Sequence, residues 1–109
     1  MKADSKSLLL QLTGDIPLFK IIDFLLENKG MDYSKTDIAK GADIARASLF
    51  NYWPVLEGKN IVKVTRKFWK TKLYTLNVKN PITQKIVELE KVIIFDAMEK
   101  TQKRILVKH

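Results

Sequence analysis

The chemistry that this sequence offers most plainly is phosphate binding by a run of positive charge. No acidic residue occurs between Glu57 and Glu88, whereas lysine and arginine recur throughout that stretch. Each phosphate that such a side chain neutralises releases condensed counterions from a nucleic acid, which favours binding. We expect contacts with a nucleic-acid backbone from Lys63, Arg66, Lys67, Lys70 and Lys72.

Polar side chains just upstream have the chemistry to read bases. Arg46 can donate two hydrogen bonds to O6 and N7 of guanine, and Asn51 can pair with adenine in the same two-point way. Ser48 and Tyr52 can bond a base or a phosphate. Because any exposed helix carries residues of these types, each of the four is a candidate base contact and no more.

The sequence contains no arrangement typical of a catalytic or metal site. It has no cysteine, and His109 is its only histidine. Its serines therefore lack a histidine base, and Glu88 and Glu90 lie two apart on a predicted helix and point in different directions. We expect no enzyme activity, no cofactor and no metal ion.

Two short helices joined by a turn position the candidate base contacts. Ser34 precedes Asp37 by three residues, a spacing that predicts a helix start, and Lys35 and Thr36 lie beside its free amides, which suit phosphate. Gly41, Ala42 and Asp43 are expected to break this helix. The second helix is predicted over 45–57 because Leu49, Trp53 and Leu56 form one apolar stripe, with Phe50 beside them.

Residues that typically begin, end or interrupt helices define the remaining helix boundaries. A helix from Ile16 to Lys29 is predicted, with Asp15 as its N-cap and Gly30 closing it. Within the helix over 45–57, Pro54 predicts either a kink or an early end, since it removes a backbone donor.

From Ile61 the hydrophobic period changes to an alternating one, which predicts a β-hairpin between Val62 and Leu76, hereafter the wing. Phe68 and Trp69 fall at its turn. They could pack back onto the domain, reach the sugar-phosphate surface, or contact a second subunit. We favour packing, because large aromatic side chains are costly to expose.

Beyond Asn80 a final helix is predicted over 81–103, with a flexible tail at 104–109. Its apolar stripe is Ile82, Ile86, Leu89, Ile93 and Ala97, with further apolar residues at Val87, Val92, Ile94, Phe95 and Met98. This stripe is wide enough to serve a homodimer interface, joined by the cluster Leu8–Leu12. The alternative is a monomer whose last helix lies flat across its own core.

Length and charge set the frame for these elements. The 109 residues are enough for one mostly helical α+β domain over 1–80 plus the final helix, and the net charge of +8 favours anionic partners. The cluster Leu8–Leu12 is far shorter than the ~18 residues of a membrane span. We expect a cytoplasmic protein with no membrane partner.

About three-quarters of the chain resembles archaeal winged helix-turn-helix regulators of the broad class that includes ArsR-like and MarR-like repressors. The resemblance rests on GDIPLFKIIDFLLENKGMDYSKTDIAK, then ARASLFNYWPVLEGKNIVKVTRK, then KLYTLNVKNPITQKIVELEK. It implies that Arg46 and Asn51 occupy the family's contact positions on the recognition helix and that Arg66 stands at the base of the wing. Two departures are Ala45, where a capping Ser or Thr is common, and Asp43 in place of a turn glycine.

Three functions follow from these patterns. The first is a dimeric, sequence-specific regulator that binds double-stranded DNA. The second is a winged-helix module that docks on a protein through the wing aromatics and the last helix. The third is single-strand or RNA binding through Phe68, Trp69 and Tyr74. The target sequence, the sign of regulation and any small-molecule effector are not visible in the sequence.

Overall fold

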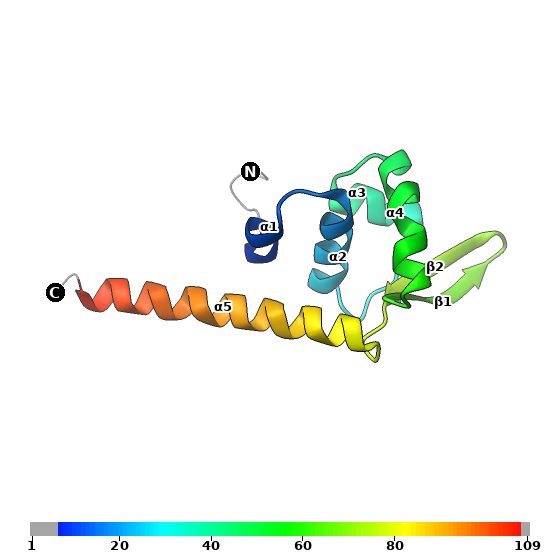
Figure 1. The fold of residues 1–109 in the computed structure, drawn as a ribbon. Helices are drawn as coiled ribbons and strands as arrows, with labels where there is room; N and C mark the ends of the chain where they lie inside the picture. Colours follow the sequence, from blue (N-terminus) through cyan, green and yellow to red (C-terminus); the bar gives the residue numbers. More distant parts are fainter. Residues whose placement is uncertain (1–6, 108–109) are drawn as a thin grey trace.

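The structure is a computed structural model that describes residues 7–107, with side chains described as far as residue 102. In chain order its elements are α1 (Leu8–Thr13), α2 (Pro17–Glu27), α3 (Lys35–Ala42), α4 (Arg46–Gly58), β1 (Val62–Phe68), β2 (Thr71–Leu76) and α5 (Pro81–Val107). The fold is therefore mostly helical α+β, with a two-stranded hairpin and a long C-terminal helix, as predicted (Figure 1). His109 lies outside the described residues.

The helix α2 is the centre of the core and contacts α1, α3 and α4. Its inward side chains, Ile21, Ile22, Leu25 and Leu26, are all buried. The predicted cap is wrong: the N-cap is Ile16, and Pro17 occupies the first turn, where a missing amide proton costs little. The helix also ends at Glu27, before the predicted end at residue 29.

The expected helix-turn-helix is formed by α3 and α4. The hydroxyl of Ser34 accepts a hydrogen bond of 3.2 Å from the amide of Asp37, so the predicted cap is confirmed. The break expected at Gly41 and Ala42 is wrong, because α3 includes both and ends only where Asp43 adopts a left-handed conformation (φ 59°). A short polar side chain tolerates that conformation.

The helix α4 buries Leu49, Trp53 and Leu56, as the stripe predicted. Ala45 is its N-cap and makes no side-chain capping bond, which agrees with the departure noted in the sequence. An early end at Pro54 is wrong, since the helix continues to Gly58.

The wing is confirmed between Val62 and Leu76, which face each other in an antiparallel ladder. Only its base is buried. Tyr74 there exchanges two backbone hydrogen bonds with Tyr33, of 2.9 and 2.8 Å, a pairing that the sequence analysis missed. Packing of the wing aromatics onto the domain is wrong, because Phe68 is 52% and Trp69 96% exposed.

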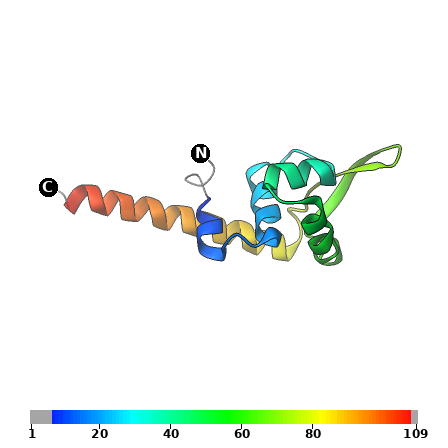
Figure 2. The ribbon, with the colours of Figure 1, turned by 90° about the horizontal axis from the view of Figure 1, so that it is seen from above.

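The last helix makes the molecule long. The side-chain oxygen of Asn80 accepts hydrogen bonds from the amides of Ile82 and Thr83 at the start of α5. The helix then runs to Val107. The predicted tail is therefore helical over 104–107. The radius of gyration is 15.9 Å, against about 13 Å for a compact domain of this length. In Figures 1 and 2 the wing projects from one end of the molecule and α5 reaches out at the other.

Candidate nucleic-acid interface

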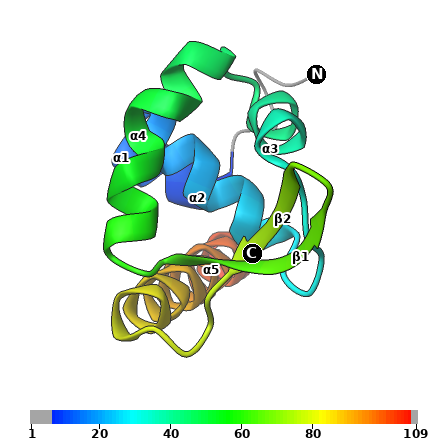
Figure 3. The ribbon, with the colours of Figure 1, turned by 90° about the vertical axis from the view of Figure 1, so that its right-hand side faces the viewer.

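A basic hollow forms where the N-terminal ends of α3 and α4 meet the start of β2. Its volume is about 330 Å³. Residues predicted from separate parts of the sequence line it together: Lys35, Thr36, Arg46, Lys70 and Lys72. Figure 3, which views the molecule from the wing side, shows the hairpin beside α3. We call this feature the basic hollow.

Aromatic rings hold two of these cations at the basic hollow. The Lys35 ammonium lies 5.5, 5.6 and 5.7 Å from the ring centroids of Phe50, Trp53 and Tyr74. The Arg46 guanidinium lies 5.6 Å from that of Phe50. Such contacts stabilise a cation without neutralising its charge, so both remain available to an anion. From its spacing Phe50 was predicted only to lie beside the core stripe, and no local pattern indicated its contact with these cations.

Backbone amides add to the positive potential of the hollow. The first amides of an α-helix have no acceptor within the helix, and this holds for α3 and α4. In α3 one of them, the amide of Asp37, instead donates to the Ser34 side chain. Because Ala45 offers no side-chain acceptor, the first turn of α4 stays open to an external anion. The partial positive charge at a helix N-terminus favours phosphate.

Only one of the predicted base contacts lines the basic hollow. Arg46 lines the basic hollow, whereas Ser48, Asn51 and Tyr52 do not. Asn51 is exposed, and Ser48 and Tyr52 are half-buried, with Tyr52 packed against the core. Of the four predicted base contacts on α4, Arg46 and Asn51 are therefore the more exposed two.

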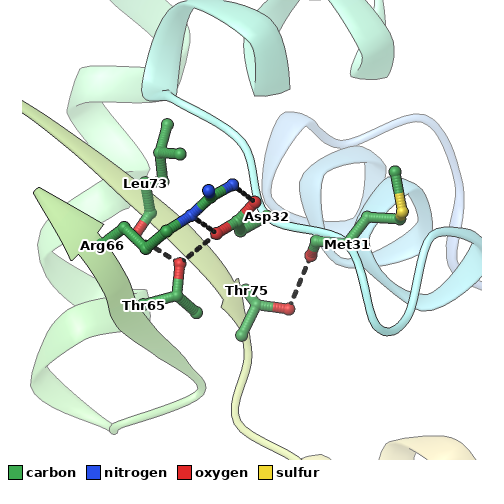
Figure 4. A network of polar contacts seen from close by, with 6 residues as sticks. All are labelled: Met31, Asp32, Thr65, Arg66, Leu73 and Thr75. Carbon is green, nitrogen blue, oxygen red and sulfur yellow. Dashed lines mark hydrogen bonds and ion pairs between the residues drawn. The ribbon is translucent and has the colours of Figure 1, made fainter. Parts of the chain in front are cut away.

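Arg66, predicted to contact a nucleic-acid backbone, is bound within the chain. Its Nε and Nη2 donate hydrogen bonds of 3.0 and 2.9 Å to the two carboxylate oxygens of Asp32 (Figure 4). The Thr65 hydroxyl donates to the same carboxylate, and that of Thr75 donates to the Met31 carbonyl. The hydrogen bond from Arg66 holds the pKa of Asp32 down to about 2. This network fixes the base of the wing to the segment between α2 and α3.

A bulge in β1 lies at the residues that bond Asp32. The ladder register shifts between Val64 and Arg66, which leaves Thr65 without a direct partner on β2. An extra residue of this kind re-aims neighbouring side chains, and here both Thr65 and Arg66 reach Asp32. The sequence offered no signal for the partner, because it lies in a segment more than thirty positions upstream.

The remaining wing lysines are not neutralised. Lys67 and Lys72 face each other directly across the ladder, and no ion pair within the described part of the chain includes either one. Like charges at opposed positions destabilise a hairpin. A bound anion would remove that cost, so this pair favours a polyanionic ligand.

Other classes of site find no support in the described residues. No three His, Cys, Asp or Glu side chains gather there as a metal ion requires. Each helix of that part of the chain is too short or too polar to cross a membrane.

No protein-family model and no curated protein matches this sequence, but solved structures resemble it. The complex of NadR with 4-hydroxyphenylacetate has a TM-score of 0.61 at 23% identity, covering 93% of this chain and 79% of NadR. A mutant of Staphylococcus aureus MepR bound to an oligodeoxyribonucleotide also gives 0.61 at 23% identity, over 89% of this chain and 69% of MepR. ZitR of Lactococcus lactis, a zinc-responsive MarR family member, gives 0.55 at 15% identity, over 81% and 60%. These likenesses show that the chain has the winged helix-turn-helix fold.

Proposed function

We propose that this chain is a MarR-like transcription regulator that binds double-stranded DNA as a homodimer. In this proposal α4 enters the major groove and the wing lies along the backbone. The observation that carries it is the convergence of Lys35, Arg46, Lys70 and Lys72 on one hollow that two helix N-termini also face. That arrangement suits the phosphates flanking a groove, and the forked guanidinium of Arg46 can also reach a base edge from α4.

The comparisons support the same class of function. MepR is described as a transcription regulator, and one of its structures contains an oligodeoxyribonucleotide. NadR holds a small aromatic acid, which makes a small-molecule effector worth testing here. The archaeal origin that the resemblance implies stays a prediction.

The homodimer is supported by exposed apolar side chains on α5. Leu89, Val92, Phe95 and Met98 are between 41% and 64% exposed. Of the stripe predicted for this role, Ile86 and Ile93 pack against the chain's own core, whereas Ile82 and Leu89 are exposed. We therefore assign the interface to the exposed set, which differs from the predicted one.

Selection from random duplexes with the purified protein tests the proposal. We expect one recovered site with twofold symmetry, half-sites one helical turn apart, and salt-sensitive nanomolar affinity. Arg46→Ala and Asn51→Ala should each weaken binding to that site by about 1–3 kcal/mol, because each removes a base contact. Lys67→Ala should weaken binding to all sequences alike, since it removes a backbone contact.

Lys91→Ala serves as the control, because this exposed lysine lies on α5, away from the basic hollow. Equal affinity for every duplex would overturn sequence-specific reading. Absence of duplex binding at low salt, together with capture of a protein that requires Trp69, would favour the docking module instead.

A further inference from the structure

The turn of the wing presents one large side chain entirely to solvent. Because Phe68 pairs with Thr71, only Trp69 and Lys70 form the turn. Trp69 is 96% exposed, more than any other large apolar residue among those described. Water-exposed indole gains nothing from folding, so packing does not account for its presence.

The backbone at Trp69 also carries strain. Its φ is 56°, in the left-handed region where a bulky side chain crowds its own backbone. Hairpin turns ordinarily place Gly, Asn or Asp at such a position. Because 96% of its side chain is exposed, packing against the described residues does not offset the strain, which points to a role in binding.

The surroundings of Trp69 are those of a phosphate-binding surface. Lys70 follows it directly, and Lys70 and Lys72 line the basic hollow together with Arg46 of α4. The hairpin extends well beyond the helices, so its turn can reach past the groove that α4 would occupy (Figure 2). The groove next to a major groove along one face of a duplex is the minor groove.

We propose that Trp69 is a wedge that enters the minor groove of duplex DNA and inserts between two base pairs. The inference rests on the proposed function and deepens it. Apolar side chains used in this way partly unstack one base step and bend the duplex. Pyrimidine–purine steps yield most easily, so the wedge selects for such a step beside the sequence that α4 reads.

The arrangement fits a duplex better than a single strand. Proteins that bind single strands offer several rings in a row on which successive bases stack. Here the neighbouring ring of Phe68 is engaged by the Arg66 guanidinium, 5.5 Å from its centroid, and Tyr74 is buried at the base of the wing. A single free ring at the end of a narrow turn has the shape of a wedge.

The test compares Trp69→Gly with the wild-type chain on a selected duplex of about 30 base pairs, the span over which bending is measurable. Glycine suits the left-handed backbone, so the free energy of unfolding should not fall. We expect Trp69→Gly to lose roughly 5- to 150-fold in affinity, the range for one stacked ring. The bend, measured by energy transfer between dyes at the two ends, should shrink as well.

Two further variants serve as controls. Trp69→Phe should keep part of the affinity and the bend, because it retains an aromatic wedge. Val78→Ala removes a half-exposed apolar side chain outside the wing and should change neither.

Each other outcome overturns the inference. If the wild-type chain binds the duplex and Trp69→Gly matches it in affinity and bend, the wedge is wrong while the proposed function stands. If Trp69→Gly loses binding only to a single-stranded oligonucleotide, Trp69 is a stacking platform instead. If the wild-type chain binds no duplex, both proposals fall.

Discussion

Arg66 illustrates how one cation of a basic hairpin can serve the fold while its neighbours face solvent. Two-point pairing with Asp32 uses two N–H groups of the planar guanidinium, an arrangement that a lysine could not reproduce. Asp32 is well covered, with 19% of its side chain exposed, whereas Arg66 remains 59% exposed. The pair joins the wing to the segment between α2 and α3, and the same hairpin carries Lys70 and Lys72 at the basic hollow.

The pH dependence of this pair is testable. Because the pKa of Asp32 is lowered from 3.8 to about 2, its contribution to stability is present above pH 3.8 and is lost as pH falls towards 2. Asp32→Asn should therefore lower the urea midpoint at neutral pH, and the difference from wild type should vanish near pH 2. Urea titrations of both proteins across that pH range measure it.

A matched control comes from a second ion pair. Lys85 and Glu88 are 3.4 Å apart and both largely exposed on α5, so Glu88→Gln should leave the urea midpoint almost unchanged. An equal effect of Asp32→Asn and Glu88→Gln would contradict the anchoring role of Arg66.

At the scale of elements, Gly41 controls how closely α3 approaches α2. A Cβ atom at this position would overlap the ring of Phe24, which itself lies 5.1 Å from the ring of Tyr33. Gly41→Ala should therefore lower the free energy of unfolding by about 1–3 kcal/mol, the usual cost of overpacking. The gain that alanine brings to an ordinary helix position would not compensate.

Gly58→Ala is the comparison for that variant. Gly58 is the last residue of α4, and a Cβ there meets nothing within 4 Å, so alanine should stabilise the chain by about 0.5–1 kcal/mol. Chemical denaturation of the two variants measures both values. Stabilisation by Gly41→Ala would show that Phe24 moves aside without cost.

The elements that sequence could predict are those with local signals. The cap at Ser34, the stripe through Leu49 and Trp53, and the alternating period of the wing all lie within a few residues of the structure they specify. Contacts between distant segments were not predictable. The bridge of Tyr33 with Tyr74 and the pairing of Asp32 with Arg66 depend on how the loop after α2 meets the hairpin.

The candidate site divides in the same way. The acid-free run pointed to Lys70 and Lys72, the start of a predicted helix pointed to Lys35, and the predicted recognition helix pointed to Arg46. The structure brings these four together. The exposure of Trp69 was not predictable in this way. Large aromatic side chains are usually buried, but at the turn of the hairpin Trp69 is almost fully exposed. The usual burial of aromatic side chains therefore led to a wrong prediction for Trp69.

At the scale of the whole molecule, the chain exposes more surface than a compact monomer would. Its accessible area is 7698 Å², against roughly 6200 Å² expected for 12.6 kDa. The excess is larger than the ~800 Å² that each partner contributes to a standard interface. The extended α5 exposes apolar side chains, and a second copy of the chain would cover a surface of this kind.

This leads to a prediction for Phe95, which is 63% exposed on α5. Phe95→Asp should convert a dimer of about 25.2 kDa (twice 12.6 kDa) into a monomer, because a carboxylate would be buried without a partner. Phe95→Leu should remain dimeric, since it keeps an apolar contact of similar shape. Sedimentation equilibrium at micromolar concentration measures the mass of each.

The same variant should change α5 itself. Within the chain, the outer part of α5 lies against the short helix α1. A helix with so few tertiary contacts is marginal in water, so the part of α5 beyond Phe95 should fray once the partner is lost. Amide hydrogen exchange should then accelerate from about residue 95 onward in Phe95→Asp, while α2 and α4 keep their protection. A wild-type chain that sediments at 12.6 kDa with a protected α5 would refute the interface, because the helix would then be stable without a second copy.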